Sequence, residues 1–244
     1  LEMINKLAIM QPYFFPYIGY FQLINAVDKF VIFDDIQYIR HGWINRNRIL
    51  SPNLEKEWHY CNVPLEKHSR TDVIKNIKIK ISENWKDSIL GKLAYYKELR
   101  APYYEGVLEL VTDCLSYDTN FISDLNIYVL KRTSEYIGIN FDYMVSSQSG
   151  FDYSNVGDSG EWALEISKQL NASVYINPAR GTKLFETSKF KQVGIELQFL
   201  DSNSISYTQS KRKYVEGLSI IDVLMWNSIE SVHDMMNYKS LTGG

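Results

Sequence analysis

Two adjacent carboxylates are the first side chains in the sequence that could carry out chemistry. Asp34 and Asp35 directly follow the apolar run 30–33. Carboxylates at the end of a strand can take a proton from an attacking nucleophile, or hold a divalent ion such as Mg²⁺ through substrate oxygens. If the strand continues, alternation would send the two side chains to opposite faces. In a purely structural interpretation, one aspartate caps a turn and the other is solvated. We favour a functional role for the aspartate pair over a structural one, because burying a charge at a sheet edge without a partner costs free energy.

A group of amide and guanidinium side chains follows this pair. Arginine offers a planar fork of donors to a phosphate or carboxylate, and asparagine can both donate to and accept from hydroxyls and amides. If the run 45–48 is extended, its two asparagines face one side and its two arginines the other. The set is more specific than any one member, since a lone surface arginine is usually solvated. The candidate substrate-binding residues of this stretch are Gln37, Tyr38, Asn45, Arg46, Asn47 and Arg48.

Two later loops could also contact an anion. The segment 67–70 is compact, polar and basic, so it could bind a phosphate. In it, His68 could act as an acid or base near neutral pH, and Ser69 and Arg70 could contact the substrate. A solvated loop explains this composition equally well. Arg180 follows another predicted strand and could contact an anion, although a lone loop arginine is usually solvated.

The elements that would position these residues begin with a βαβ unit. An apolar run over 6–10, a helix from Pro16 or Tyr17 and a second apolar run over 30–33 follow one another closely. This order predicts a right-handed crossover between parallel strands. Ligands bind beyond the carboxyl ends of such strands, where the loop 11–17 and the aspartate pair would meet.

The remaining periodicity divides the chain into three parts. Residues 3–82 form an N-terminal α/β half that carries the candidate site, 83–140 a helical region, and 141–240 a C-terminal α/β half that completes the same domain. The predicted fold class is therefore α/β, with a mostly parallel, Rossmann-like (nucleotidyltransferase-like) sheet and a helical inserted region. Further strands are expected over 57–63, 74–81, 143–145, 173–177 and 195–200, and helices over 83–99, 102–116, 120–137 and 159–170, with a final helix capped by Ser219.

Composition narrows the class of protein. The chain has 244 residues, of which 45% are hydrophobic and 23% charged, the proportions of a globular domain. Its net charge of −3 argues against a nucleic acid partner, and no run reaches the roughly 18 apolar residues of a transmembrane segment. Cys61 and Cys114 are far apart, which predicts free thiols in a reducing cytoplasm, and the scattered histidines argue against zinc. The aromatic content of 14% permits a homodimer.

Several motifs together resemble the WbqC-like family. They are Gln11–Tyr20, Asp34–Tyr38, Asn45–Arg48 and Leu218–Asp222. These motifs span nearly the whole chain, and the amino-terminal one is quite specific. The resemblance implies a bacterial, cytoplasmic protein of the kind often encoded among lipopolysaccharide O-antigen genes. Within the amino-terminal motif, the further candidate substrate-binding residues are Gln11, Tyr17 and Tyr20.

A weaker similarity connects the first βαβ unit to nucleotidyltransferase-like α/β proteins. Their HxGH motif occupies the place of Tyr17-Ile18-Gly19-Tyr20, where tyrosines replace both histidines. Because tyrosine carries no positive charge to stabilise a transferring phosphate, the similarity supports the fold more than the chemistry. The sequence also lacks the GxxxxGK[ST] and GxSxG motifs and a GxGxxG after the first strand. These absences argue against P-loop hydrolysis, an α/β-hydrolase and nicotinamide binding.

Two functional hypotheses follow. In the first, the protein is a cytoplasmic transferase of O-antigen or polysaccharide biosynthesis. It joins an acyl or aminoacyl group to an amino sugar that is nucleotide-linked or lipid-linked. Asp34 or Asp35 takes the proton of the attacking amine, and donors stabilise the developing negative charge. The residues expected to hold the pyrophosphate or orient the sugar are Arg46, Arg48, Arg70, Asn45 and Asn47.

The second hypothesis is a noncatalytic protein that binds a sugar nucleotide or acts as a scaffold in the same pathway. A nucleotidyltransferase-type enzyme is a further alternative. The missing HxGH histidines favour the noncatalytic protein, whereas the concentration of carboxylates, amides and arginines at one sheet edge favours an enzyme.

Overall fold

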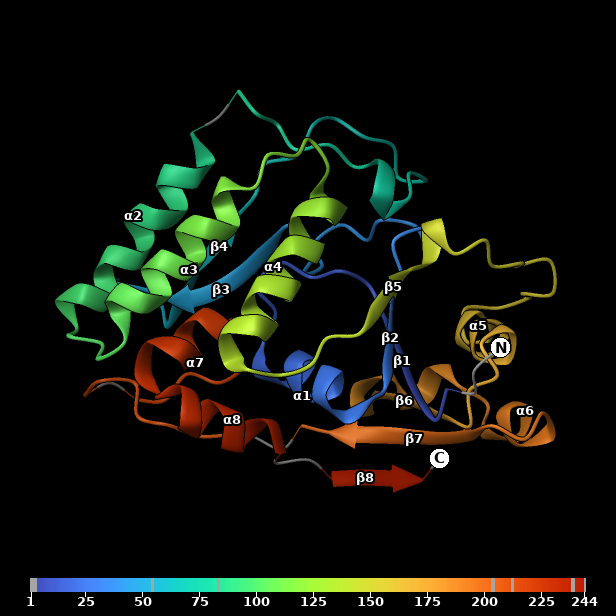
Figure 1. Ribbon diagram of the computed structural model, residues 1–244. Coiled ribbons are helices and arrows are strands. Elements are labelled where there is room, and N and C mark those ends of the chain that lie inside the picture. Colours follow the sequence, from blue (N-terminus) through green and yellow to red (C-terminus); the bar gives the residue numbers. More distant parts are fainter. Residues whose placement is uncertain are drawn as a thin grey trace.

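A six-stranded sheet lies at the centre of the computed structural model, which describes residues 4–53, 55–82, 84–202, 205–211, 213–237 and 240–243 (Figure 1). In spatial order its strands are β5 (Tyr143–Val145), β2 (Lys29–Ile32), β1 (Lys6–Met10), β6 (Val174–Pro178), β7 (Glu196–Asp201) and β8 (Ser240–Gly243). All neighbouring pairs are parallel except β7 and β8. The parallel strands, counted along the chain, have the order 3-2-1-4-5 of a Rossmann-like sheet. The predicted α/β fold class is confirmed.

The first βαβ unit places two loops at one edge of the sheet. β1 is a short strand whose three central residues are buried, and α1 (Ile18–Ala26) begins soon after Pro16. The ladder cannot continue between them, because Pro12 and Pro16 lack the N–H donor. β1 and β2 pair in parallel, as predicted, so the loops that follow them leave the sheet at the same edge.

The run of arginines and asparagines forms a separate β-hairpin. β3 (Arg46–Leu50) pairs with the antiparallel β4 (Trp58–Asn62), and β4 is one of the predicted strands. Because the run is extended, Asn47 is buried while Arg46 and Arg48 lie partly exposed on the other face of the hairpin.

The strand predicted over 74–81 is wrong. Ile74–Asn76 is a single 3₁₀ turn, η1, and the residues described after it make only isolated β-bridges. The spacing of the buried side chains explains the error. Ile74, Ile77 and Ile79 are all buried, and a spacing of three followed by two does not place them on one face of a strand.

Helices cover both faces of the sheet. The predicted middle helices α2 (Trp85–Glu98), α3 (Tyr104–Ser116) and α4 (Ile122–Ile137) share one hydrophobic core with the hairpin and one face of the sheet. On the other face, α5 (Glu161–Gln169) and α6 (Thr187–Gln192) close a second core. No helix was expected at α6.

Two short helices near the carboxyl end complete the first core. α7 (Ile220–Trp226) begins at Ser219, whose Oγ accepts a hydrogen bond from the Ile221 N–H at 3.2 Å, as predicted. α8 (Ile229–Asn237) packs against α1, where Gln22 Nε2 donates to the Met235 carbonyl. No helix in the described part of the chain is long and apolar enough to cross a membrane. Both cysteines are buried free thiols, as predicted.

Candidate functional site

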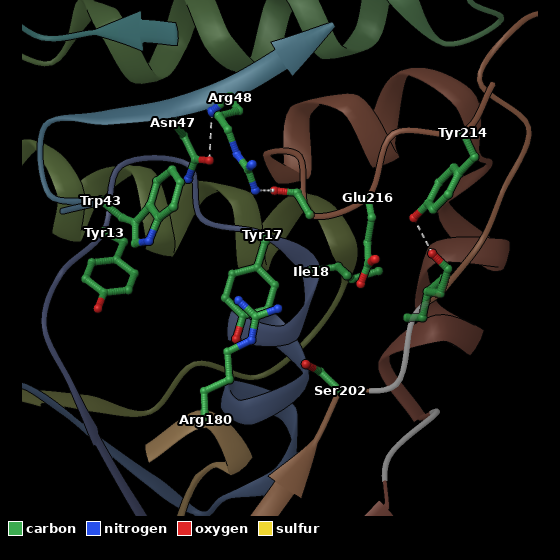
Figure 2. A pocket seen from close by; sticks show the side chains of 12 residues that line it. Tyr13, Tyr17, Ile18, Trp43, Asn47, Arg48, Arg180, Ser202, Tyr214 and Glu216 are labelled. Carbon is green, nitrogen blue, oxygen red and sulfur yellow. Dashed lines mark hydrogen bonds between the residues drawn. The ribbon is translucent and has the colours of Figure 1, made fainter. Parts of the chain in front are cut away.

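A pocket lies where the sheet changes its direction of winding. From β1 the chain crosses to β2 on one side, and it later returns to β6 on the other. The loops after β1 and β6 therefore leave a crevice between them. The pocket in this crevice has a volume of about 270 Å³, and we call it the switch-point pocket (Figure 2). Its lining residues are Tyr13, Tyr17, Ile18, Trp43, Asn47, Arg48, Arg180, Ser202, Ile205, Tyr214, Glu216 and Gly217.

Arg48 enters the pocket from β3 and is held by neutral groups. Its Nη2 donates to the Gly217 carbonyl at 2.8 Å, and its guanidinium carbon lies 5.2 Å from the ring centroids of Trp43 and Trp58. The Arg48 Nε is buried and has no hydrogen-bond partner among the described residues. Gly217 has φ +68°, and a Cβ there would lie 3.0 Å from Arg48 Nη2. A side chain at this position would strain the left-handed backbone and crowd Arg48 Nη2.

Tyr17 and Arg180 form another wall of the pocket. Arg180 lies in the 3₁₀ segment η3 (Ala179–Leu184) after β6 and extends toward Tyr17 (Figure 2). Burial raises the pKa of Tyr17, and a hydrogen bond with Ser202 and the charge of Arg180 partly oppose the rise. A Cβ on Gly19 would lie 2.4 Å from Tyr17 Cε2, so the ring can lie against this turn of α1 only over glycine.

The other tyrosines of the pocket are hydrogen-bond donors rather than bases. Burial, with a smaller effect of Tyr17, raises the pKa of Tyr13 to about 12. Burial and, to a lesser extent, the charge of Asp222 raise the pKa of Tyr214 to about 12. Both phenols therefore stay protonated at neutral pH. Glu216 is exposed and is the one carboxylate among the residues that line the pocket.

The two arginines of the pocket have no carboxylate partner among the residues that the structure describes. Neither Arg48 nor Arg180 forms an ion pair with another described residue, whereas Arg132 pairs with Asp113 and Glu135. Arg48 is half-buried and held by neutral groups, and Arg180 is exposed, so both keep their charge available for an incoming anion. The pocket can therefore hold a phosphate or carboxylate beside aromatic rings that suit a sugar or a base.

The aspartate pair lies elsewhere on the same sheet edge. Its side chains were expected to face apart, and this is wrong, because β2 ends at Ile32 and the chain bends at Asp35. Both carboxylates reach Ser146 Oγ, at 3.2 Å from Asp34 Oδ1 and 2.5 Å from Asp35 Oδ1. Ser147 donates its N–H and Oγ–H to Asp34, and Tyr153 donates its hydroxyl to Asp35.

These hydrogen bonds give Asp34 and Asp35 a structural role. They tie the end of β2 to the segment after β5, and Asp34 is only 3% exposed. Neither carboxylate lines the switch-point pocket. The described residues contain no group of three His, Cys, Asp or Glu side chains that could hold a metal ion, so we derive no step through Mg²⁺. A catalytic role for Asp34 or Asp35 stays a prediction.

The remaining predicted site residues form three groups: those in the switch-point pocket, those in a second pocket, and those that line neither. Tyr17, Asn47, Arg48 and Arg180 meet in the switch-point pocket, where Asn47 is fixed by donating to the Phe14 carbonyl. Another group lines a second pocket beside the hairpin. Its members are Tyr38, Asn45, Arg46 and His68. The residues that line neither of these two pockets are Gln11, Tyr20, Gln37, Ser69 and Arg70.

The contacts of three of these residues explain why they line neither pocket. Tyr20 is 1% exposed, and its hydroxyl donates to the Gln11 carbonyl at 2.9 Å, so Tyr20 belongs to the core and we do not retain it in the proposed site. Gln37 is exposed and donates to the Arg70 carbonyl. Ser69 uses its hydroxyl within its own turn, at 3.0 Å from Thr71 Oγ1.

Sequence reasoning missed several residues of the switch-point pocket. Tyr13 lies in the loop that was expected to meet the ligand, and Trp43 comes just before the arginine-asparagine run. Their positions in the sequence could therefore have identified both as candidate site residues. Ser202, Tyr214 and Glu216 carry no local signal, since only the fold brings their segments to β1.

The fold and pocket define a Rossmann-like α/β protein with an anion-capable pocket at its topological switch point. Residues 11–234 match the WbqC-like protein family, and the chain belongs to this family, which confirms the resemblance of its motifs. An uncharacterized protein of Mycobacterium tuberculosis strain H37Rv, Rv1507c, is 25% identical over 235 residues, covering 96% of this chain and 98% of that protein. No solved structure matches the chain.

Proposed function

We propose that the protein is a transferase of O-antigen or polysaccharide biosynthesis that binds a nucleotide-linked or lipid-linked amino sugar in the switch-point pocket. The reaction is amide formation, in which an acyl or aminoacyl group is transferred to the sugar amine. One observation carries the proposal: two arginines that pair with no described carboxylate flank a pocket lined by tyrosine and tryptophan at the switch point of the sheet.

The pocket chemistry suits a phosphorylated sugar. Arg180 is exposed and can form bidentate hydrogen bonds with a phosphate, and Arg48 brings a second positive charge to the pocket wall. The rings of Tyr17 and Trp43 offer apolar surface to a sugar or base, while the protonated Tyr13 phenol offers a donor to a hydroxyl group.

The transfer step needs a base and donors to a developing oxyanion. The amine nitrogen forms a bond to the acyl carbon, the bond from that carbon to its leaving group breaks, and the amine proton must be removed. Glu216 takes this proton in the present proposal, because it lines the pocket and Asp34 and Asp35 do not. The oxyanion is stabilised by the positive charge of Arg48, which lines the pocket.

Thermal stabilisation by a panel of nucleotide amino sugars, free nucleotides and acyl or aminoacyl donors tests binding. A ligand that binds only the folded state raises the melting temperature. We expect a nucleotide amino sugar to stabilise the wild type and the control Arg100→Gln, which removes an exposed arginine outside both pockets. Arg180→Gln should bind at least about tenfold more weakly. Equal stabilisation of Arg180→Gln would overturn the proposal.

Glu216→Gln then tests catalysis. If Glu216 is the base, the variant should keep its ligand-induced stabilisation and lose about 100-fold or more in turnover of the bound sugar. The exposure of Glu216 favours the noncatalytic alternative, since an exposed carboxylate is solvated by water rather than directed at a substrate. Unchanged pathway output in cells that carry Glu216→Gln would support this alternative and contradict the role of Glu216.

A further inference from the structure

A second pocket beside the hairpin concentrates positive charge. It has a volume of about 510 Å³ and shares no lining residue with the switch-point pocket. We call it the basic pocket. The basic side chains that line it are Arg40, His41, Arg46, Lys67 and His68, and Glu66 is its one acidic residue. This local excess of basic groups contrasts with the net charge of −3 of the whole chain.

Arg46 is the most constrained of these basic groups. Its Nε donates to the Gly42 carbonyl at 3.2 Å, its Nη2 donates to the His41 carbonyl at 2.6 Å, and its guanidinium carbon lies 4.4 Å from the centroid of Tyr60. Like Arg48, it forms no ion pair with a described carboxylate. The guanidinium is thus held in place by neutral groups while its charge stays uncompensated.

The turn that holds Arg46 is itself shaped for this contact. His41 has φ +64°, a left-handed conformation that is unfavourable for a residue other than glycine. This conformation belongs to the residue whose carbonyl accepts from Arg46. Strained backbone of this kind persists where the surrounding structure enforces it, and it is enriched at ligand sites.

A chain of hydrogen bonds fixes the opposite wall. Tyr38 donates its hydroxyl to Asn45 Oδ1 at 2.8 Å, and Asn45 Nδ2 donates to the Val63 carbonyl at 2.9 Å. His68 packs edge-on against Tyr38 with 4.8 Å between ring centroids, and its Nδ1 lies 3.0 Å from the Ser69 carbonyl. Because a carbonyl only accepts, this contact places a proton on Nδ1, and Nε2 can donate to a phosphate oxygen when it carries a proton as well.

The two pockets adjoin the same strand. Arg46 and Arg48 are two residues apart on the same face of β3, so their Cα atoms are separated by roughly 7 Å. Arg48 lines the switch-point pocket and Arg46 lines the basic pocket. One face of β3 therefore supplies an arginine to each pocket, as expected if the two pockets hold two substrates of one transfer reaction.

We propose that the basic pocket binds a phosphate group of the second substrate, the phosphorylated donor of the acyl or aminoacyl group. This inference rests on the proposed function, because a transfer needs a donor beside the amino sugar. The recognised chemistry is a phosphate or diphosphate held by Arg46 and by the Lys67 and His68 side chains.

Calorimetric titration with inorganic pyrophosphate tests this inference. We expect the wild type and the control Arg100→Gln to bind two equivalents. Arg46→Gln should keep one equivalent and bind the other at least about tenfold more weakly, and Arg180→Gln should show the converse. Because Arg46 also packs on Tyr60, the double variant Lys67→Gln with His68→Gln provides a second test that spares this contact, and it should behave like Arg46→Gln.

The outcomes separate this inference from the proposed function. If the wild type binds one equivalent and only Arg180→Gln weakens its binding, the proposed phosphate site in the basic pocket is overturned, and the proposed site in the switch-point pocket is retained. One equivalent that both Arg46→Gln and Arg180→Gln weaken would mean a single diphosphate bridging the pockets, and would also overturn a separate donor site. If the wild type binds no pyrophosphate, the inference fails, and stabilisation by a nucleotide amino sugar still decides the proposed function.

Discussion

Single residues set how close the ligand-binding groups can come to the backbone. Gly217 approaches Arg48 in a left-handed conformation, and Gly19 makes room for the Tyr17 ring against α1. In both places a methyl group would occupy space that a pocket side chain now fills. The glycines therefore belong to the pocket although they present no functional group to a ligand.

Gly217→Ala is a direct test of this view. The new methyl group would press on Arg48 Nη2, and φ +68° would become strained, so Arg48 should shift. We expect a nucleotide amino sugar to bind about tenfold more weakly, as measured by thermal stabilisation. Gly91→Ala is the matched control, because nothing lies within 4 Å of its Cβ position in α2. Undiminished binding by Gly217→Ala would show that Arg48 is not held in the way described.

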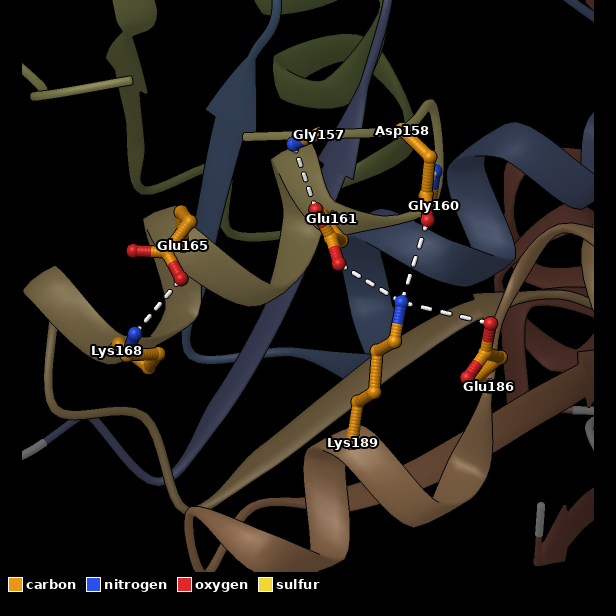
Figure 3. A network of polar contacts seen from close by, with 8 residues as sticks. All are labelled: Gly157, Asp158, Gly160, Glu161, Glu165, Lys168, Glu186 and Lys189. Carbon is orange, nitrogen blue, oxygen red and sulfur yellow. Dashed lines mark hydrogen bonds and ion pairs between the residues drawn. The ribbon is translucent and has the colours of Figure 1, made fainter. Parts of the chain in front are cut away.

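At the scale of elements, two polar clusters link segments that are far apart in the sequence. One is the aspartate pair with the serines after β5. The other is Lys189 of α6, whose Nζ lies 2.8 Å from Glu161 Oε1, 3.2 Å from Asp158 Oδ2 and 3.4 Å from Glu186 Oε1 (Figure 3). The first cluster connects β2 to β5, and the second connects α6 to the start of α5.

Asp34→Asn should destabilise the fold without weakening ligand binding in the switch-point pocket. The amide loses the charge, and one of its ends is a donor facing the Ser146 and Ser147 donors. We expect a loss of about 1–3 kcal/mol in the free energy of unfolding, measured in urea. Asp118→Asn, at an exposed position, is the control. A stable Asp34→Asn that binds but does not turn over would instead restore the catalytic role predicted from the sequence.

Lys189→Met should lower the melting temperature in a pH-dependent way. The hydrogen bond to Lys189 is the main cause that lowers the pKa of Glu161, and for Asp158 the Gly160 N–H comes first and Lys189 second. Lowered carboxyl pKa values stabilise the fold above the ordinary values of 4.5 and 3.8, and this contribution is lost as the pH falls through the lowered values.

The difference in melting temperature between wild type and Lys189→Met should therefore be full at pH 7 and vanish well below pH 3.8. Lys191→Met is the control, because this exposed lysine of the same helix forms no ion pair with a described residue. An equal difference at both ends of the pH range would mean that Lys189 acts through packing alone.

At the scale of the whole molecule, the sequence predicts the sheet better than the site. Apolar runs bounded by proline or by charge identify β1, β2, β6 and β7, because a buried parallel strand is apolar on both faces. α6 and β8 are short and polar enough to give no such signal. Arg48 and Arg180 were found by residue type, but the two separate pockets follow only from the hairpin and the crossover to β6.

The order in which the parts of the pocket are synthesised has a consequence for folding. α1 is buried on nearly all sides, and its amino end is fixed late in the chain: the Ile220 N–H donates to the Pro16 carbonyl and Ser219 Oγ–H to the Phe15 carbonyl. During synthesis α1 thus lacks these contacts until the segment that contains Ser219 and Ile220 has emerged from the ribosome. Nascent chains should expose this apolar segment until then, and a chain cut before Ser219 should aggregate rather than retain a weakened pocket.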